Sequence, residues 1–299
     1  MFSIGVDVGG TNLRAIRVAR GTRIEARVKR PTEAALGWPA VACAIAEAVR
    51  KVAGGKRPAA IGIAVPGAID DARGIVTESP NIPGGPDFPL ARTLRKLFRG
   101  SSLRGTPLAI ENDANAAAWG EFRFGAGRGC NHMVLLTLGT GIGGGIVVSG
   151  RLHRGADGTA GEIGHVVVRA EGARCPCGRH GCLEAYCAAN ALVRSAGRIA
   201  KTPADLARLA DRGNSRAREA FRRYGQNLGI AIASILNLLN PERIVLAGGI
   251  SNELDLFGPT LKAEACRRAF ALPGRRALIL KGTLGDDAGA LGAAALAGI

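Results

Sequence analysis

Short apolar segments alternate along the chain with longer amphipathic segments. The short ones are rich in Val, Ile and Leu and end at Gly, Pro or Asn, which is typical of buried strands. Predicted strands cover residues 3–8, 13–19, 24–29, 60–65, 108–110, 133–138, 146–149, 243–247 and 277–280. Predicted helices cover residues 36–52, 113–122, 183–199, 203–210, 215–239, 253–271 and 287–297. This alternation predicts an α/β fold in which helices cover the faces of the sheets.

One arrangement, a strand, a Gly/Thr loop and a returning strand, occurs twice. It covers residues 3–19 and again residues 133–149, which indicates a weak internal duplication about 130 residues apart. After the first copy, Arg20-Gly21-Thr22 is expected to form the next hairpin turn. A chain of 299 residues suggests about two domains. Because no linker rich in Pro, Ser or charge divides the chain, we expect the domains to pack tightly around a cleft.

Composition and charge narrow the partners. The hydrophobic content of 47% fits a globular protein. A net charge of +16 raises the question of nucleic acid, but the basic residues are scattered among acids and aromatics are only 4%. The N-terminus has no basic leader, and the uncharged stretches 131–150 and 226–241 are broken by glycines or too short and polar to span a bilayer. We expect a soluble, cytoplasmic protein without nucleic-acid or membrane partners.

The first glycine loop, Asp7-Val8-Gly9-Gly10-Thr11-Asn12, follows a buried strand. Its glycines let the backbone approach an anion closely and turn N–H groups toward phosphate, while Thr11 adds a hydroxyl donor. Asp7 could hold Mg²⁺ directly or through a water, since Mg²⁺ binds few carboxylates together with phosphate oxygens. Taken alone, the motif fits a plain hairpin with Asp as a turn former equally well.

The second loop, residues 139–145, stands at the equivalent place in the second half and includes Thr140 and Gly141. Two such hairpins facing each other would make a nucleotide clamp, which favours the phosphate interpretation of both. The Walker pattern is absent, and neither loop leads into a helix as a dinucleotide fingerprint requires.

Asp113 follows a predicted strand and opens a helix. One interpretation is an N-cap, because Asp is a favoured capping residue. The other is a general base that accepts a hydroxyl proton during in-line attack on a phosphate. An Asp at the start of a helix that faces a cleft could do both.

A cluster of soft ligands gives the strongest chemical signal. His165, Cys175, Cys177 and Cys182 lie within 18 residues and supply the four N/S ligands of a closed structural zinc site. His180 lies inside the same loop and is a competing ligand. A disulfide is disfavoured in a cytosolic chain. The other cysteines, Cys43, Cys130, Cys187 and Cys266, are expected to be ordinary buried thiols.

Taken together, these motifs resemble the ROK family, which groups bacterial sugar kinases with related repressors. The match covers nearly the whole chain and rests on DVGGT (7–11), ENDAN (111–115), LGTGIGG (138–144), GEIGH (161–165), CPCGRHGCLE (175–184) and AGG (247–249). The resemblance implies a duplicated, actin-like and ribonuclease-H-like α/β fold with its active site between two domains. We expect a small domain at 1–112, completed by the C-terminal helix 286–299, and a large domain at 113–299 with a zinc loop at 165–182.

The resemblance also implies roles for individual residues. Asp113 is expected to be the catalytic base. The expected sugar ligands are Asn81, Asn112, Asp113, Glu162, His165 and Glu184. The expected ATP and Mg²⁺ contacts are Asp7, Gly9, Gly10, Thr11, Asn12, Thr140, Gly141 and Gly249. His165 would bind zinc through one nitrogen and the sugar through the other, and zinc would be structural.

The activity implied is transfer of the γ-phosphate of ATP to the 6-hydroxyl of glucose, by a homodimer or homotetramer. An N-acetylmannosamine kinase, another hexose kinase, or a sugar-responsive regulator are the alternatives. Many relatives carry Lys where Asn12 stands, and Arg14 is a candidate to replace its charge. The repressor branch carries a helix-turn-helix segment before its first phosphate loop, and that loop begins here at residue 7, so a kinase is expected.

Overall fold

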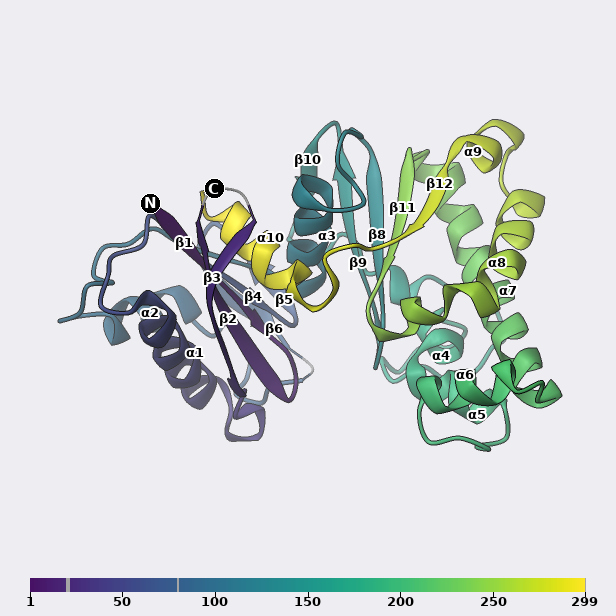
Figure 1. The fold of residues 1–299 in the computed structure, drawn as a ribbon, viewed down its shortest axis with the longest axis horizontal. Helices are drawn as coiled ribbons and strands as arrows, with labels where there is room; N and C mark the ends of the chain where they lie inside the picture. Colours follow the sequence, from purple (N-terminus) through teal and green to yellow (C-terminus); the bar gives the residue numbers. More distant parts are fainter. Residues whose placement is uncertain (20–21, 80, 299) are drawn as a thin grey trace. The chain divides into compact units, whose positions relative to one another are not determined.

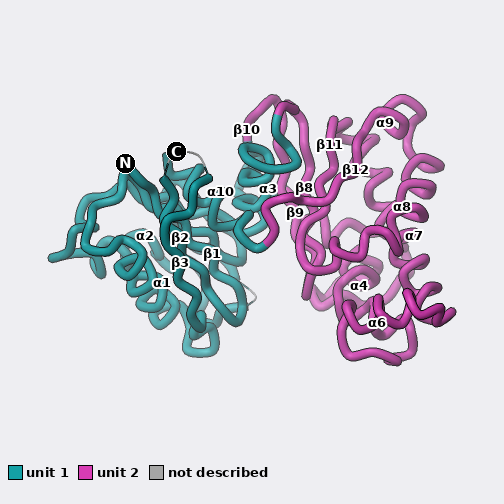
Figure 2. The backbone as a smooth tube through the Cα atoms, viewed as in Figure 1, with its two compact units in different colours: residues 1–128, 152–160, 286–299 teal, residues 129–151, 161–285 magenta. Residues whose placement is uncertain are grey.

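The computed structural model describes residues 1–19, 22–79 and 81–298, and the chain forms two compact units (Figure 2). Unit 1 comprises residues 1–128, 152–160 and 286–299, and unit 2 comprises residues 129–151 and 161–285. Arg20 and Gly21 of the expected hairpin turn, and Pro80 in the loop that carries Asn81, lie outside the described residues. The division into domains after residue 112 stays a prediction.

Unit 1 is built on a five-stranded sheet in the order β3-β2-β1-β4-β7. Its strands are β1 (Phe2–Val8), β2 (Asn12–Ala19), β3 (Arg23–Pro31), β4 (Ile61–Val65) and β7 (Leu108–Asn112). β1, β2 and β3 form an antiparallel meander, and β4 and β7 continue the sheet parallel to β1. The other elements are η1 (Ala34–Leu36), α1 (Trp38–Ala53), β5 (Ala68–Asp70), β6 (Ile75–Glu78), α2 (Leu90–Leu97), α3 (Asp113–Phe124), η4 (Gly285–Asp287) and α10 (Ala288–Leu296).

Unit 2 repeats this order, with a sheet arranged β10-β9-β8-β11-β12. The strands of this sheet are β8 (Met133–Leu138), β9 (Ile142–Val148), β10 (Arg151–His153), β11 (Arg243–Ala247) and β12 (Leu278–Lys281), and of β10 only Arg151 falls in unit 2. β8 pairs antiparallel with β9 and parallel with β11, as β1 does with β2 and β4. The repeated strand order confirms the internal duplication. The helices are η2 (Ile163–His165), α4 (Glu184–Cys187), α5 (Ala189–Ser195), α6 (Pro203–Asp211), α7 (Ser215–Leu239), η3 (Gly249–Glu253), α8 (Leu254–Arg268) and α9 (Ala271–Arg276).

Each sheet owes its stability to helices that cover it. In unit 1 the apolar stripe of α1, with Val41, Ile45 and Val49, joins the core formed by β1 and β4. In unit 2 the long helix α7 places buried residues at four-residue spacing, including Tyr224, Leu228, Ile232 and Leu236. Such stripes supply most of the stability of a helix through burial rather than intrinsic propensity.

The C-terminal helix α10 packs closely against the β1–β4 face and against α3 in unit 1 (Figure 1). Glycines make this approach possible, because a Cβ at Gly5, Gly62 or Gly292 would overlap the backbone of Ala290, Ala293 or Ala116, respectively. Residues from the end of the chain therefore lie beside the first strand, close to the first glycine loop.

The second glycine loop is shorter than predicted. Leu138 pairs with Ile142, so only residues 139–141 form the turn, and the next three glycines belong to β9. A Cβ on Gly144 would lie 2.5 Å from the backbone oxygen of Gly161 and 2.6 Å from Cδ1 of Ile163. Gly144 is therefore required by a segment that crosses β9 and not by a flexible loop.

Other differences concern element boundaries. The single helix expected at 183–199 is broken at Ala188, which is extended with φ −69° and ψ 155°. This break lets the N–H of Ala189 donate to the carbonyl of Gly139 at 2.8 Å. The short elements α2, β5, β6, β10 and α9 were not predicted. Within the described residues, no helix combines the length and apolar character that crossing a membrane requires.

Candidate active site

In unit 1 the first glycine loop and Asp113 emerge at the same edge of the sheet. β1, β4 and β7 are parallel neighbours, and their register aligns Asp7, Ala64 and Glu111 in one row. Two strand spacings of about 4.8 Å put Asp7 and Glu111 roughly 10 Å apart along this row. The expected phosphate loop and the expected base therefore share the carboxyl edge of one sheet.

A buried threonine holds the first loop in shape. The hydroxyl of Thr32 donates to the carbonyl of Gly9 at 2.6 Å, and its N–H donates to the carbonyl of Thr11 at 3.0 Å. Thr32 is completely buried, whereas Gly10 and Thr11 are exposed. No sequence signal marks Thr32, because the fold alone brings β3 beside the loop.

Asp7 lies beneath this loop, beside Gly289 of α10, where a Cβ would come within 2.8 Å of its carboxyl carbon. Part of the side chain is exposed, but most of its surroundings are protein. This burial raises the pKa of Asp7 to about 6, which the positive charge of Arg14 lowers and the negative charge of Asp286 raises. The guanidinium of Arg14 is itself bound to Asp286, at 2.5 Å from its carboxylate and 2.7 Å from its carbonyl.

Asn112, and not Asp113, caps helix α3. The side-chain oxygen of Asn112 accepts hydrogen bonds from the N–H groups of Ala114 and Asn115 at 2.9 and 3.0 Å. Its amide nitrogen donates to the carbonyl of Gly67 at 3.0 Å. The capping interpretation of Asp113 is therefore wrong, and Asp113 is the half-buried first residue of α3.

The loop that carries Asn81 is anchored on α1. Ile82 is buried, and the carbonyl of Pro83 accepts a hydrogen bond from the N–H of Trp38 at 3.3 Å. Asn81 itself is exposed in a turn. Its expected role as a sugar ligand stays a prediction.

In unit 2 the second loop and Gly249 also meet at the carboxyl edge of a sheet. β8 and β11 are parallel, and a Cβ on Gly248, which has φ +84°, would lie 2.6 Å from the carbonyl oxygen of Leu138. Thr140 at the tip of the turn is exposed. Thr140, Gly141 and Gly249 are thus brought to one edge, as their expected role in nucleotide binding requires.

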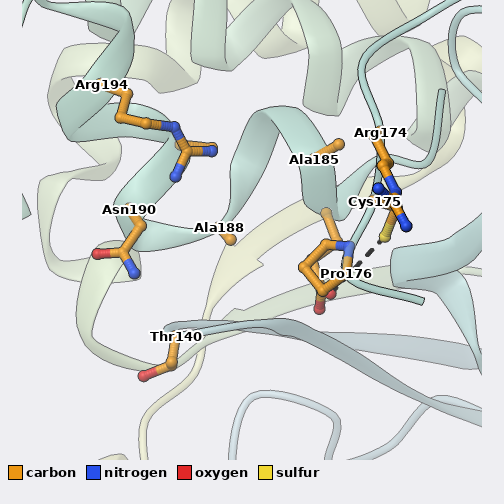
Figure 3. A pocket seen from close by; sticks show the side chains of 10 residues that line it. Thr140, Arg174, Cys175, Pro176, Ala185, Ala188, Asn190 and Arg194 are labelled. Atoms are coloured by element: carbon orange, nitrogen blue, oxygen red, sulfur yellow. Dashed lines mark hydrogen bonds between the residues drawn. The ribbon is translucent and has the colours of Figure 1, made fainter. Parts of the chain in front are cut away.

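A pocket of about 400 Å³ opens beside Thr140 (Figure 3). Its lining joins the second loop to the cysteine loop and to α4 and α5. The lining residues are Thr140, Arg174, Cys175, Pro176, Glu184, Ala185, Ala188, Asn190, Ala191 and Arg194. The lining brings two guanidinium groups and a hydroxyl together with the carboxylate of Glu184, so the pocket is polar and carries both signs of charge.

The four predicted zinc ligands converge. The ligand atoms of His165, Cys175, Cys177 and Cys182 all lie within 4.8 Å of one another. Two of the separations are 3.8 Å, between the Cys177 and Cys182 sulfurs and between Cys175 Sγ and His165 Nδ1. A tetrahedron with Zn–S bonds of about 2.3 Å has edges of about 3.8 Å, so this donor set fits zinc.

Without a cation, the thiols of this cluster differ in acidity. Burial raises the pKa of the Cys175 thiol to about 12, while the backbone N–H of Arg179 is the main group that lowers the pKa of Cys177 to about 7. A bound cation would stabilise the thiolates that burial disfavours. His180 is exposed and is not part of the cluster, and Cys43 and Cys266 are exposed rather than buried as predicted.

Two expected sugar ligands lie against the cysteine cluster. His165 directs Nδ1 toward Cys175, and its Nε2 lies 3.8 Å from a carboxylate oxygen of Glu162. The expected division of the imidazole between metal and substrate stays a prediction. Glu184 is different, because its Oε2 accepts a hydrogen bond from the N–H of Ile142 at 2.9 Å.

The chain is similar over nearly its whole length to known proteins. The chain is 38% identical to a glucokinase of Thermotoga maritima over 98% of this chain and 96% of that protein. Among solved structures, a ROK family glucokinase from Streptomyces griseus in complex with glucose and AMPPNP is 34% identical, with a TM-score of 0.83 and 99% of each chain covered. A ROK hexokinase from Thermus thermophilus is 35% identical, with a TM-score of 0.83 and 99% and 98% coverage.

These likenesses confirm the expected actin-like α/β fold. The family model described as "ROK family" matches residues 3–298. That match leaves out only the first two residues and the last one. The chain belongs to the ROK family.

Proposed function

We propose that this protein is an ATP-dependent glucokinase that phosphorylates the 6-hydroxyl of glucose. The observation that carries the proposal is the similarity over essentially the whole chain to glucokinases, one of them solved with glucose and AMPPNP. The proposal is supported by the two glycine loops, which follow equivalent strands in the two units.

Unit 1 supplies the base and one phosphate loop. Asp113 accepts the proton of the 6-hydroxyl as that oxygen attacks the γ-phosphorus, and the bond between phosphorus and the departing ADP oxygen breaks. Gly9, Gly10, Thr11 and Asn12 contact phosphate oxygens. Asp7 holds Mg²⁺, directly or through a water, and Mg²⁺ supplies neutralisation of the phosphate charge when bound.

Unit 2 supplies further nucleotide and sugar contacts. Thr140, Gly141 and Gly249 contact the nucleotide, and Glu162, His165 and Glu184 bind sugar hydroxyls. Asn81 and Asn112 of unit 1 complete the sugar ligands. The side-chain amide of Asn112 would bind sugar in addition to capping α3 and bonding to Gly67. Several rigidly held carboxylates and amides are what oriented binding of a polyhydroxylated ring requires.

Zinc has a structural role in this proposal. His165, Cys175, Cys177 and Cys182 would form a closed set of four ligands that leaves no position for water. The cation would hold the loop that carries His165 at one end and Glu184 just beyond the other. Seven free thiols suit a reducing compartment such as the cytoplasm. A dimer or tetramer stays a prediction, which light scattering can check.

A coupled-ADP assay over a panel of sugars tests the proposal. We expect the highest kcat/KM with glucose, slower turnover with mannose and glucosamine, and little ADP without sugar. A higher kcat/KM for N-acetylmannosamine than for glucose would mean that N-acetylmannosamine, and not glucose, is the preferred acceptor. ATP turnover that ignores added sugar, or no turnover at all, would contradict a sugar kinase.

A further inference from the structure

An ion pair between Glu111 and Arg154 lies at the end of β7, two residues before the proposed base. The carboxylate of Glu111, the penultimate residue of β7, is only 5% exposed, and its Oε2 lies 2.7 Å from Nε of Arg154. Its other oxygen accepts hydrogen bonds from the N–H of Asn112 at 3.0 Å and from the side chain of Asn115 at 3.1 Å. One carboxylate thus holds both the end of β7 and the first turn of α3, on either side of Asp113.

Arg154 reaches Glu111 from a separate segment of unit 1. Residues 152–160 belong to this unit although the residues on either side of the segment belong to unit 2. The segment closes on itself through a hydrogen bond from the N–H of Ala160 to the carbonyl of Arg154 at 3.0 Å. Gly158, with φ +84°, packs so closely on the backbone of Ile69 that a Cβ would overlap it. Arg154 is therefore presented from an ordered loop.

Arg154 and Glu111 differ in their exposure and in the number of their charged partners. Arg154 is 31% exposed and also lies 3.2 Å from Asp71, whose side chain is 46% exposed, so the guanidinium has a second partner. Glu111 is buried, and Arg154 is the cation that compensates its charge in the described part of the chain. Loss of the cation from a buried pair is costly, because it leaves an uncompensated charge.

We propose that Arg154, through Glu111, is a positioning residue that fixes the β7–α3 junction and thereby aims the carboxylate of Asp113. This inference rests on the proposed function, in which Asp113 is the base. Arg154 touches no reacting atom in this scheme. Its effect on rate comes from orientation, for which a misplacement of about 1 Å can cost about 100-fold.

The test compares variants by steady-state kinetics with glucose, after thermal unfolding has shown that each is folded. Arg154→Ala is expected to lower kcat about 10-fold to 100-fold, with a smaller change in the KM for glucose. Arg154→Lys should recover part of the loss, because an ammonium can still pair with Glu111. Arg73→Ala removes an exposed guanidinium of the same unit and should leave kcat unchanged.

Two double variants separate positioning from general damage. Glu111→Gln combined with Arg154→Ala should be at least as active as Arg154→Ala alone, because no buried charge remains and the amide oxygen still accepts from Asn112. In an Asp113→Asn background, Arg154→Ala should lower kcat by no more than about twofold, since the group it positions is already lost.

The outcomes distinguish this inference from the proposed function. Unchanged kcat in Arg154→Ala, while Asp113→Asn is nearly inactive, would overturn the positioning role and leave the base assignment intact. The positioning role would also be overturned if the fold-loss in kcat of the double variant equalled the product of the fold-losses of Arg154→Ala and Asp113→Asn. Near-full turnover of Asp113→Asn would remove the base itself, and the positioning role with it.

Discussion

The side chain of Glu184 accepts a hydrogen bond from the backbone N–H of Ile142 at 2.9 Å, which ties α4 to the turn between β8 and β9. Its other carboxylate oxygen lies 4.0 Å from the sulfur of Cys175. Glu184 therefore stands between the proposed zinc cluster and the second glycine loop. The residue that the family resemblance implied as a sugar ligand thus also contacts the loop that we propose to bind nucleotide.

Replacing Glu184 should weaken nucleotide binding in the absence of sugar. Glu184→Ala removes a hydrogen bond to a charged acceptor, worth about 1.5–3 kcal/mol, and frees the turn at Gly141. We expect the Kd for AMPPNP, measured by calorimetry, to rise by about 10-fold to 100-fold. Glu171→Ala, at an exposed position of the same unit, serves as control. An unchanged Kd would show that the hydrogen bond to Ile142 does not support the loop.

Loss of zinc should weaken the binding of both sugar and nucleotide, through different residues. Cys177→Ala is expected to lose about one equivalent of zinc per chain by elemental analysis, because a closed site needs all four ligands. Sugar affinity should fall most, since His165 is itself a ligand, and nucleotide affinity should fall less, through Glu184.

Cys43→Ala removes an exposed thiol remote in sequence and should retain the metal. A metal-free wild-type protein that binds glucose normally under reducing conditions would refute the zinc site. Zinc loss without any change in sugar affinity would leave the ligand set in place and refute the coupling.

Replacing the proposed base should separate chemistry from binding. Asp113→Asn keeps the size of the side chain and the Asn112 cap, so we expect the fold and the Kd for glucose to be largely retained. The kcat should fall by roughly 10²–10⁴, the usual contribution of a positioned base. Single-turnover kinetics measure the chemical step directly, and Asp255→Asn, an exposed substitution, is the control. Near-normal single-turnover rates would exclude Asp113 as the base.

Short-range sequence patterns predicted the elements and the ligand cluster that depend on neighbouring residues. The strands around both glycine loops, α7 and the four-ligand cluster were all visible in the sequence, because strand periodicity and Cys/His spacing are short-range signals. The position of Asp113 at the start of a helix was also predicted. Its N-cap was misassigned because Asn and Asp are equally good caps, and only backbone conformation separates them.

Contacts between distant segments could not be predicted in this way. Thr32, the residue after β3, bonds to the first loop, and Arg154, far along the chain, pairs with Glu111 at the β7–α3 junction. The glycines of β9 resembled a loop because nothing local shows that the backbone of Gly161 crosses them. In each case the partner is chosen by sheet topology, which residue type and spacing alone do not specify.

Asp7 should make the affinity for nucleotide depend on pH. Burial raises the pKa of Asp7 to about 6, with Arg14 opposing the rise and Asp286 adding to it. The carboxylate is therefore ionised at pH 8 and protonated at pH 5, and only the ionised form can hold Mg²⁺. The affinity for Mg²⁺ and AMPPNP should fall as the pH drops through about 6. The phosphates of the nucleotide also titrate in this range, so Asp7→Asn provides the reference. This variant should bind nucleotide more weakly, and its affinity should lack the part of the pH dependence that the Asp7 carboxyl causes.

The same shift has the opposite sign for the stability of the protein without ligands. A carboxyl whose pKa rises on folding, here from 3.8 to about 6, favours the folded state while protonated, and this contribution is lost as the pH rises through that interval. Ionised Asp7 then lowers the free energy of unfolding by about 3 kcal/mol, at 1.36 kcal/mol for each pKa unit. Asp7→Asn should therefore have a higher Tm than the wild type at pH 8, and the difference should shrink as the pH approaches 4. If the wild type and Asp7→Asn had equal Tm values at both pH 8 and pH 4, burial would not raise the pKa of Asp7. The predicted pH dependence of nucleotide binding would then have no physical basis.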